Sequence, residues 1–553
     1  MMGDMSISPV AARRAAGRRR GRTGWVPAIA LTVTALLGIG ACSAGGSSSS
    51  QAAPPAAGGA PSGGAAQATG SAAGIVPGHG TLRWHSCGGL LAQQGVPECA
   101  TLSVPVDYAK PGGRHISLAL DMIPATAPKS QQQGVLLVNP GGPGGSGLPL
   151  AAEVAQGLSP GVAAQYDIVG FDPRGVGSSV PALSCDRSFF AGVRPNYIPA
   201  SHAAEQVLIN RAKTYATDCG KKYGWLLPYM TSQDAARDMD AIRAAFGVSK
   251  INYYAFSYGT YLGQVYATLF PDRVRRMVLD SVVDPTGVWY ADNVDQDYAF
   301  QGRINAFYAW VAQYASTYNL GSTAAQVRAA WYRARNQLLA HPANGMIGPD
   351  EFDDTYLLGG YDDQLWPGLA QALSTYLNEG NATDLIGQYR SYGVQNENEF
   401  AVYNAVECAD TSWPSSFSFW TTDTEQVYKS AQFYTWGNTW FNAACAFWPV
   451  HGPSEPLQIT GADLPGILML QGTLDPATPY AGAQDAHKLL PSARMVVVEG
   501  GGNHGQSFSQ PPDSCVQGYL NNYLSTGALP QGDQGSGLVN ATCPAVANPT
   551  PGR

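Results

Sequence analysis

Six short runs dominated by apolar residues constrain the fold of this chain more than any other feature of the sequence. They lie at residues 134–138, 166–171, 251–254, 274–279, 467–470 and 494–498. A continuous apolar run of this length is typical of a strand that is buried on both faces. Helical signals separate the first four runs, including an amphipathic stretch at 232–246. Strands that alternate with helices predict an α/β fold with a mostly parallel central sheet flanked by helices.

The pattern changes in the middle of the chain. Residues 286–457 are rich in Tyr, Trp, Asn and Gln, with helical texture and without buried-strand runs. Strand runs occur on both sides of this segment, and 553 residues are enough for a large domain with an insertion. The sequence therefore predicts one core built from residues 81–285 and 458–545, with residues 286–457 inserted as a helical cap.

The first 41 residues have the pattern of an export signal. Arginines precede an uncharged run from Trp25 to Ala41, and small residues lead directly into Cys42. This ending predicts a lipoprotein-type signal peptide at residues 1–41 with the lipid on Cys42. A transmembrane anchor is the alternative, although 17 residues make a short span, and the paired arginines leave twin-arginine export open. Residues 42–80, mostly Ala, Gly, Ser and Pro, are expected to be a flexible tether.

The charge balance argues against a polyanionic partner. The first 41 residues hold six arginines and one aspartate, so the rest of the chain carries 26 basic and 39 acidic residues, a net charge of −13. No basic patch remains that would attract nucleic acid. We expect no nucleic-acid partner, and membrane contact only through the N-terminal lipid.

Eight of the nine cysteines lie beyond Cys42. An even number of cysteines in an exported chain implies disulfide bonds. Many pairings are possible, but the cysteines fall into four neighbouring couples, and short closures are favoured: Cys87–Cys99, Cys185–Cys219, Cys408–Cys445 and Cys515–Cys543. No two cysteines have CxxC spacing, which disfavours a zinc site and thiol catalysis, so no metal is expected.

A sharp turn follows the third strand run, at Ala255-Phe256-Ser257-Tyr258-Gly259, and an apolar helical stretch comes next. A serine at the tip of such a turn adopts strained backbone angles, and its hydroxyl is lifted clear of the sheet. The strand and the helix nearly touch there, so small side chains are needed two residues before and after the serine. Gly259 meets this demand, and Ala255 meets it less well than the glycine that is usual at that position. Ser257 is therefore a candidate nucleophile, although small-x-Ser-x-Gly also occurs by chance.

Two further polar residues follow the last two strand runs. Asp475 comes just after 467–470, and His504 comes just after 494–498. The carboxyl ends of parallel strands meet at one edge of a sheet. A serine nucleophile needs an imidazole to take its proton and a carboxylate to orient the imidazole. The sequence therefore predicts a Ser257, Asp475 and His504 triad. Thr478 either steadies Asp475 or caps the next helix.

A glycine-rich loop, Gly141-Gly142-Pro143-Gly144, follows the first strand run. Acyl transfer builds negative charge on a carbonyl oxygen, which two backbone N–H groups should face. One donor is expected from Tyr258, directly after the serine, and the other from this loop. A phosphate-binding loop is disfavoured, because no Gly-Lys-Ser/Thr follows and the prolines lack an N–H.

These motifs together resemble the exported tripeptidyl aminopeptidases of actinobacteria, α/β-hydrolase relatives of the prolyl iminopeptidases. The resemblance spans residues from about 80 to about 530 and rests on 139–147, 172–178, 257–260, 475–476 and 503–505. It implies the α/β-hydrolase fold, a serine exopeptidase that releases short peptides from free N-termini, and no cofactor. Matched by position, the triad is Ser257, Asp475 and His504, and the oxyanion donors are Gly142 and Tyr258. Ala255 and Asn139-Pro140 depart from the usual pattern.

An aminopeptidase must hold a free ammonium group, which requires carboxylates in the cap. Glu407 and Asp410, which flank Cys408, are the first candidates, and Asp362 and Asp363 are weaker ones. An ordinary surface carboxylate is the alternative in each case. The aromatic residues between 413 and 448 either line apolar subsites or form the core of the cap. Asp172 and Arg174 are expected to form a structural pair.

Two other functions compete with a serine aminopeptidase. A lipase or esterase uses the same triad and differs only in how the cap recognises the substrate. A non-catalytic surface protein that keeps the fold for binding is the second alternative, and the intact triad argues against it. We expect a monomer that acts on the N-termini of peptides or proteins, either as a cell-membrane lipoprotein or as a secreted protein.

Overall fold

The computed structural model describes residues 82–551, except residue 462 and residues 533–536. The predicted signal peptide, Cys42 and the tether at 42–80 lie outside the described residues. Within the described part of the chain, no helix is both long enough and apolar enough to cross a membrane.

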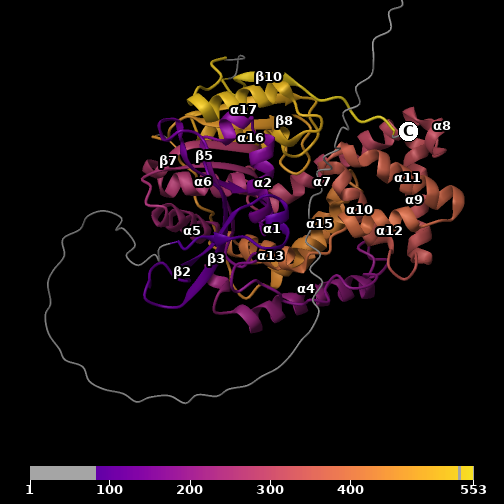
Figure 1. Ribbon diagram of the computed structural model, residues 1–553. Coiled ribbons are helices and arrows are strands. Elements are labelled where there is room, and N and C mark those ends of the chain that lie inside the picture. The colour runs from indigo at the N-terminus through magenta and orange to yellow at the C-terminus, as the bar shows by residue number, and fades with distance from the viewer. Residues whose placement is uncertain (1–81, 462, 533–536, 552–553) are drawn as a thin grey trace, which may run out of the picture. The chain divides into compact units, whose positions relative to one another are not determined.

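One ten-stranded sheet forms the centre of the molecule (Figure 1), in the order β1-β2-β3-β5-β4-β6-β7-β8-β9-β10. The pairings from β1 to β5 are antiparallel, and all those from β5 to β10 are parallel. The predicted α/β fold with a mostly parallel sheet is confirmed. The strands are β1 His85–Ser86, β2 Glu98–Pro105, β3 His115–Ile123, β4 Gly134–Asn139, β5 Tyr166–Asp172, β6 Ile251–Ser257, β7 Val274–Val282, β8 Ile467–Gly472, β9 Ala493–Glu499 and β10 Ala541–Pro544.

The six predicted strand runs became β4 to β9, and their side chains are buried on both faces of the sheet. Leu137 and Tyr253 face one apolar cluster, while Leu136 and Tyr254, one residue away along each strand, face another. Successive side chains of a strand point to opposite faces, so a strand covered on both sides must be apolar throughout. Helices α5 Ser232–Ala245, α6 Tyr258–Leu269 and α16 Tyr480–Leu489 cover the first face, and α2 Leu148–Gly157, α3 Pro160–Ala163 and α17 Ser514–Thr526 cover the second.

Nine α-helices and two short 3-10 helices lie between β7 and β8, and no strand of the sheet comes from this part of the described chain. We call residues 290–447 the cap. Its helices are α7 Tyr290–Gln313, α8 Ala315–Tyr318, α9 Ala324–Ala340, α10 Pro349–Tyr361, α11 Trp366–Glu379, α12 Thr383–Tyr392, α13 Glu397–Asp410, α14 Phe417–Tyr428 and α15 Thr435–Asn442. Trp331, Trp366 and Phe307 lie in a separate apolar cluster of the cap, which therefore has a core of its own.

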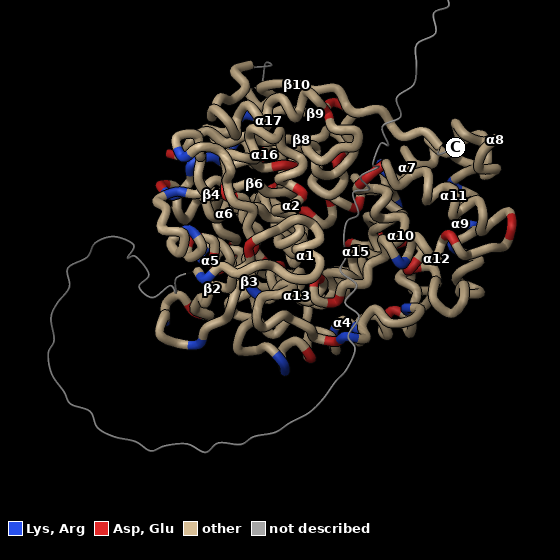
Figure 2. The backbone as a smooth tube through the Cα atoms, in the orientation of Figure 1, with Lys and Arg blue, Asp and Glu red and all other residues tan. Residues whose placement is uncertain are grey.

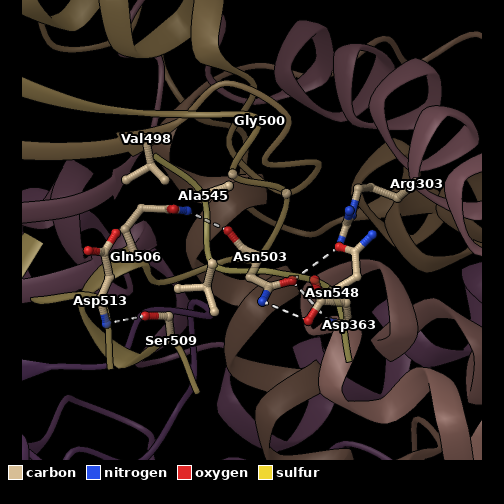
Figure 3. Close-up of a pocket in the computed structure, with 13 residues that line it drawn as sticks. Arg303, Asp363, Val498, Gly500, Asn503, Gln506, Ser509, Asp513, Ala545 and Asn548 are labelled. Carbon is tan, nitrogen blue, oxygen red and sulfur yellow. Dashed lines mark hydrogen bonds between the residues drawn. The ribbon is translucent and has the colours of Figure 1, made fainter. Parts of the chain in front are cut away.

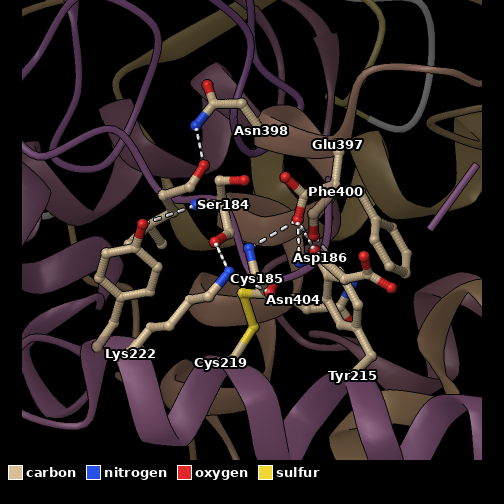
Figure 4. The surroundings of a disulfide bond; sticks show 12 residues. Ser184, Cys185, Asp186, Tyr215, Cys219, Lys222, Glu397, Asn398, Phe400 and Asn404 are labelled. Carbon is tan, nitrogen blue, oxygen red and sulfur yellow. Dashed lines mark hydrogen bonds between the residues drawn. A yellow bond between two sulfur atoms is a disulfide. The ribbon is translucent and has the colours of Figure 1, made fainter. Parts of the chain in front are cut away.

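Helix α13 joins the cap to the sheet domain. Phe400 packs in the same apolar cluster as β4 and β6 and stacks on Phe189, with ring centroids 4.9 Å apart. The carboxylate of Glu397 accepts hydrogen bonds from Cys185 N at 2.7 Å, Asp186 N at 3.0 Å and the hydroxyl of Tyr215 at 2.8 Å (Figure 4). Tyr215 lies on α4 His202–Tyr223. This end of α13 is therefore fixed by both packing and polar contacts.

The described residues form four disulfides, which are the four neighbouring couples: Cys87–Cys99, Cys185–Cys219, Cys408–Cys445 and Cys515–Cys543. Cys185–Cys219 connects the segment after β5 to α4 beside the Glu397 contacts (Figure 4). Cys408–Cys445 lies within the cap, and Cys515–Cys543 joins α17 to the edge strand β10. The bonds therefore close local loops in the sheet domain and in the cap.

The expected pair of Asp172 with Arg174 is not formed. Arg174 instead makes a two-pronged ion pair with Asp238 of α5, Nε to Oδ2 at 2.8 Å and Nη2 to Oδ1 at 2.7 Å. Asp172 accepts hydrogen bonds from Ser146 Oγ at 2.5 Å and Ser178 N at 2.7 Å. Asp172 and Asp238 thus both have structural roles. Asp238, the partner of Arg174, lies on a helix distant in sequence, so the local spacing of residues could not predict this pair.

Replacing Asp238 should destabilise the protein strongly. The side chains of Arg174 and Asp238 are each 1% exposed, so Asp238→Asn leaves a buried guanidinium without its counter-ion. We expect a loss of about 3–5 kcal/mol in the free energy of unfolding, measured by urea titration. The matched control is Asp218→Asn, which breaks the exposed Lys221–Asp218 pair and should cost less than about 1 kcal/mol. Equal effects of the two substitutions would contradict this account.

Candidate active site

The serine turn joins β6 to α6 with strained geometry. Ser257 has φ 56° and ψ −133°, a left-handed conformation that non-glycine residues rarely adopt. A Cβ added at Gly259 would come within 2.6 Å of Asn139 Oδ1 and 3.0 Å of Ala255 Cβ. Glycine is therefore required at 259, while the methyl group of Ala255 still fits. The departure at Ala255 thus leaves the turn intact.

His504 and Asp475 form a buried couple beyond the ends of β9 and β8. His504 Nδ1 lies 3.0 Å from both Oδ1 and Oδ2 of Asp475. Asp475 also accepts hydrogen bonds from Ala477 N at 3.0 Å and from the hydroxyl of Thr478 at 3.2 Å. Thr478 therefore steadies the carboxylate, one of its two expected roles. His504 Nε2 is buried and has no hydrogen-bond partner among the described residues.

The loop of His504 lies against the serine strand. Asp280 of β7 is the cross-strand neighbour of Phe256, and its carboxylate accepts hydrogen bonds from Gln506 N at 2.8 Å and Ser507 N at 2.9 Å. A Cβ added at Gly505 would lie 3.6 Å from the ring of Phe256. The ends of β6, β7, β8 and β9 thus bring the three predicted triad residues to one edge of the sheet.

Two buried groups at this edge have shifted pKa values. Burial alone would lower the pKa of His504, but the charge and hydrogen bond of Asp475 outweigh it and raise the pKa above its usual value of 6.5. Burial raises the pKa of Asp280 to about 6, against the hydrogen bonds from Ser507 and Gln506. No role was predicted for Asp280, although its position directly after the strand run 274–279 was a signal for it.

The glycine-rich loop approaches the serine turn closely. A Cβ added at Gly141 would lie 2.6 Å from Phe256 O, 2.8 Å from Ser257 Cβ and 3.0 Å from Tyr258 N. Gly141 and Gly142 have φ values of 98° and 110°, which favour glycine. Gly141 N donates to Asn139 Oδ1 at 2.9 Å, so it is already occupied. Tyr258 N is at the first residue of α6, where the helix itself offers no acceptor.

The two predicted cap carboxylates, Asp410 and Glu407, have different surroundings. Asp410 accepts hydrogen bonds from Ser232 N at 2.7 Å and Ser232 Oγ at 2.5 Å, so both its oxygens are engaged with the start of α5. Burial raises the pKa of Asp410 to about 7. Glu407 is 3% exposed and lies 3.5 Å from Nδ2 of Asn293. Burial raises the pKa of Glu407 well above its ordinary value, and no salt bridge of the described residues includes it.

A cavity in the cap adjoins Glu407 through Asn293. Its lining includes Asn293, Asp297, Asn438 and the rings of Trp413 and Trp420. Asn438 Nδ2 donates to Asn293 O at 2.7 Å and to Asp297 Oδ1 at 3.0 Å. Burial raises the pKa of Asp297 to about 8. The aromatic segment therefore contributes both to the cap core and to this cavity, and no motif distinguished Asp297 in the sequence.

Acidic residues predominate around this part of the molecule. Figure 2 shows acidic positions, in red, between the sheet and the cap helices α10 and α15. Burial raises the pKa of Glu407, and the nearby carboxylate of Asp410 raises it further. Burial likewise raises the pKa of Asp292, and the carboxylate of Glu407 adds to that rise. Among the described residues, no group of three or more His, Cys, Asp or Glu side chains is placed to hold a metal ion.

The comparisons with known proteins agree with this geometry. Residues 134–509 match the sequence family described as the alpha/beta hydrolase fold. The chain belongs to the α/β hydrolase family. It is 40% identical over 467 residues to a tripeptidyl aminopeptidase of Streptomyces coelicolor, which covers 82% of this chain and 84% of that relative. The resemblance indicated by the motifs is therefore confirmed.

Two further relatives come from Mycobacterium tuberculosis. Serine protease Hip1 is 32% identical over 476 residues, covering 81% of this chain and 89% of the relative. Carboxylesterase B is 33% identical over 471 residues, covering 81% of this chain and 88% of the relative. The names of the relatives thus include both peptide and ester hydrolysis.

The pH dependence of activity should depend on the Asp475–His504 couple. An imidazole acts as a base only when it is neutral, so activity should rise as the pH rises through the pKa of His504. Because Asp475 raises that pKa, the apparent pKa of this rise should lie above 6.5. Asp475→Asn removes the group that raises this pKa. The acidic limb should then shift to lower pH, and kcat should fall about 10⁴-fold. The measurement is kcat/KM between pH 5 and 9, and an unshifted limb would contradict the assignment.

Proposed function

We propose that this protein is a serine exopeptidase that releases short peptides from free N-termini. The observation that carries the proposal is the His504–Asp475 couple at the same sheet edge as a serine held at the strained tip of a strand–helix turn. The similarity to a tripeptidyl aminopeptidase over four-fifths of the chain supports the substrate class. No cofactor is needed for this chemistry.

In the proposed mechanism, Ser257 Oγ attacks the scissile carbonyl while His504 Nε2 takes the hydroxyl proton. His504 Nδ1–H stays hydrogen-bonded to Asp475, which stabilises the imidazolium. The N–H groups of Tyr258 and Gly142 stabilise the oxyanion. His504 then gives its proton to the leaving amine. Water, activated by the same imidazole, hydrolyses the Ser257 ester and releases the N-terminal peptide.

We assign recognition of the ammonium group to Glu407. Both oxygens of Asp410 are engaged by Ser232, whereas Glu407 is a buried carboxylate with no cation among the salt bridges of the described residues. Its raised pKa reflects burial without a counter-charge, and a bound ammonium would stabilise the ionised form. Asn293 and the adjoining polar cavity continue this site. Asp410 then has a supporting role, fixing α13 against α5.

An esterase is the second candidate, because carboxylesterase B is a relative of similar length. The two functions share the triad and differ in whether the cap requires a free amine. The four disulfides fit an oxidising compartment outside the cytoplasm. We therefore propose an exported protein, with Cys42 as the site of lipidation.

Removing the charge of Glu407 should separate these candidates. In Glu407→Gln, kcat/KM for a tripeptide p-nitroanilide with a free amine should fall about 10–100-fold, the worth of a charge-assisted hydrogen bond. The N-acetylated tripeptide should be a poor substrate for wild type, and its kcat/KM should be the same in Glu407→Gln. The control is Glu425→Gln, an exposed carboxylate on α14. If wild type cleaves both tripeptides equally well, the esterase is favoured.

A further inference from the structure

The loop that carries His504 is hydrogen-bonded to the end of strand β7. Gly505 N donates to Ser281 Oγ at 2.8 Å, Gln506 N donates to Asp280 Oδ1 at 2.8 Å, and Ser507 N donates to Asp280 Oδ2 at 2.9 Å. Three consecutive N–H groups after His504 are thus fixed by the end of β7. These contacts position the residues that follow His504. Asn503, the residue before it, accepts a hydrogen bond at its carbonyl from Gln506 Nε2 of the same loop, and its side chain contacts the cap.

The cap holds the near side of the same loop. His504 N donates to Tyr361 O at 2.8 Å, and the ring of Tyr361 meets the imidazole edge-on with centroids 5.4 Å apart. Asn503 Oδ1 accepts from Asp363 N at 3.0 Å and from Arg303 Nη2 at 3.1 Å. Asn503 Nδ2 donates to Asp363 Oδ1 at 3.1 Å. Figure 3 shows Asn503 pointing toward Asp363 and Arg303.

These cap groups are themselves rigidly placed. Arg303 of α7 is 6% exposed, its guanidinium lies over the ring of Trp366 at 5.0 Å, and its Nε donates to Gly360 O at 3.2 Å. Tyr361 ends α10, and Asp363 begins the turn of 3-10 helix at Asp363–Leu365. Asn503, the residue directly before His504, therefore contacts the cap at the point where α7, α10 and this 3-10 turn meet.

We propose that the cap positions the catalytic base, and that Asn503 is the positioning residue through which it does so. This inference rests on the proposed role of His504. The cap then has two functions: it recognises the N-terminus of the substrate and it sets the direction of His504 Nε2. A shift of about 1 Å in a reacting group costs about 100-fold in rate, so losing the Asn503 contacts affects proton transfer more than substrate affinity.

The first test compares a peptide with a small ester. Asn503→Ala should lower kcat about 10–100-fold for a free-amine tripeptide p-nitroanilide, with KM unchanged. It should lower the hydrolysis of p-nitrophenyl acetate by the same factor, because that ester is too small to use the cap carboxylates. The matched control is Asn336→Ala, an exposed asparagine on α9. An unchanged rate with the ester, in a protein that melts like wild type, would overturn the proposal.

The second test exchanges the amide and the carboxylate. Asn503→Asp alone brings two carboxylates together where Asn503 Nδ2 and Asp363 Oδ1 now lie 3.1 Å apart, and kcat should fall. Adding Asp363→Asn restores a donor opposite an acceptor and keeps the Arg303 contact, so the double variant should recover most of the lost kcat. A double variant as slow as Asn503→Asp would overturn the proposal, even if Asn503→Ala does not fold.

The same assays separate this inference from the proposed substrate. If wild type hydrolyses the ester but not free-amine peptides, the aminopeptidase assignment fails. A parallel loss and recovery of ester hydrolysis in the Asn503 variants would still support the role of the cap.

Discussion

The structure depends on one constraint: the ends of four neighbouring parallel strands must present a serine, an aspartate and a histidine at the same edge. A buried imidazole would ordinarily lose its affinity for a proton, and the Asp475 carboxylate reverses this by lying 3.0 Å from Nδ1. That contact needs β8 and β9 side by side, with apolar residues on both faces. The sheet core is therefore a condition for the electrostatics of the site.

Several contacts couple the cap to the sheet domain, and two of them lie beside features described above. Glu397 binds the backbone beside the Cys185–Cys219 disulfide, and Asn503 meets Arg303 and Asp363 next to the imidazole. The proposed ammonium-binding residue, Glu407, lies on α13, and the proposed positioning contacts of His504 come from α7 and the turn after α10, so both proposals assign their roles to the cap.

Much of the fold was predictable because buried parallel strands have a local signature. All six runs became strands, and the serine turn was recognisable from Ala255 to Gly259 with its small flanking residues. The tertiary partners of charged residues outside the predicted triad were not predictable. Arg174 pairs with Asp238 of α5 rather than with nearby Asp172, and Asp410 is engaged by Ser232. Such contacts join residues 64 and 178 positions apart, and no periodicity encodes them.

Ser257 is the proposed nucleophile, and every other proposed role at this site depends on it. The most direct measurement is mass spectrometry of the protein after treatment with a fluorophosphonate probe, with Ser257→Ala as the comparison. We expect a single adduct on the peptide that contains Ser257, and none on the variant. An unlabelled wild-type protein, or equal labelling of Ser257→Ala, would contradict it.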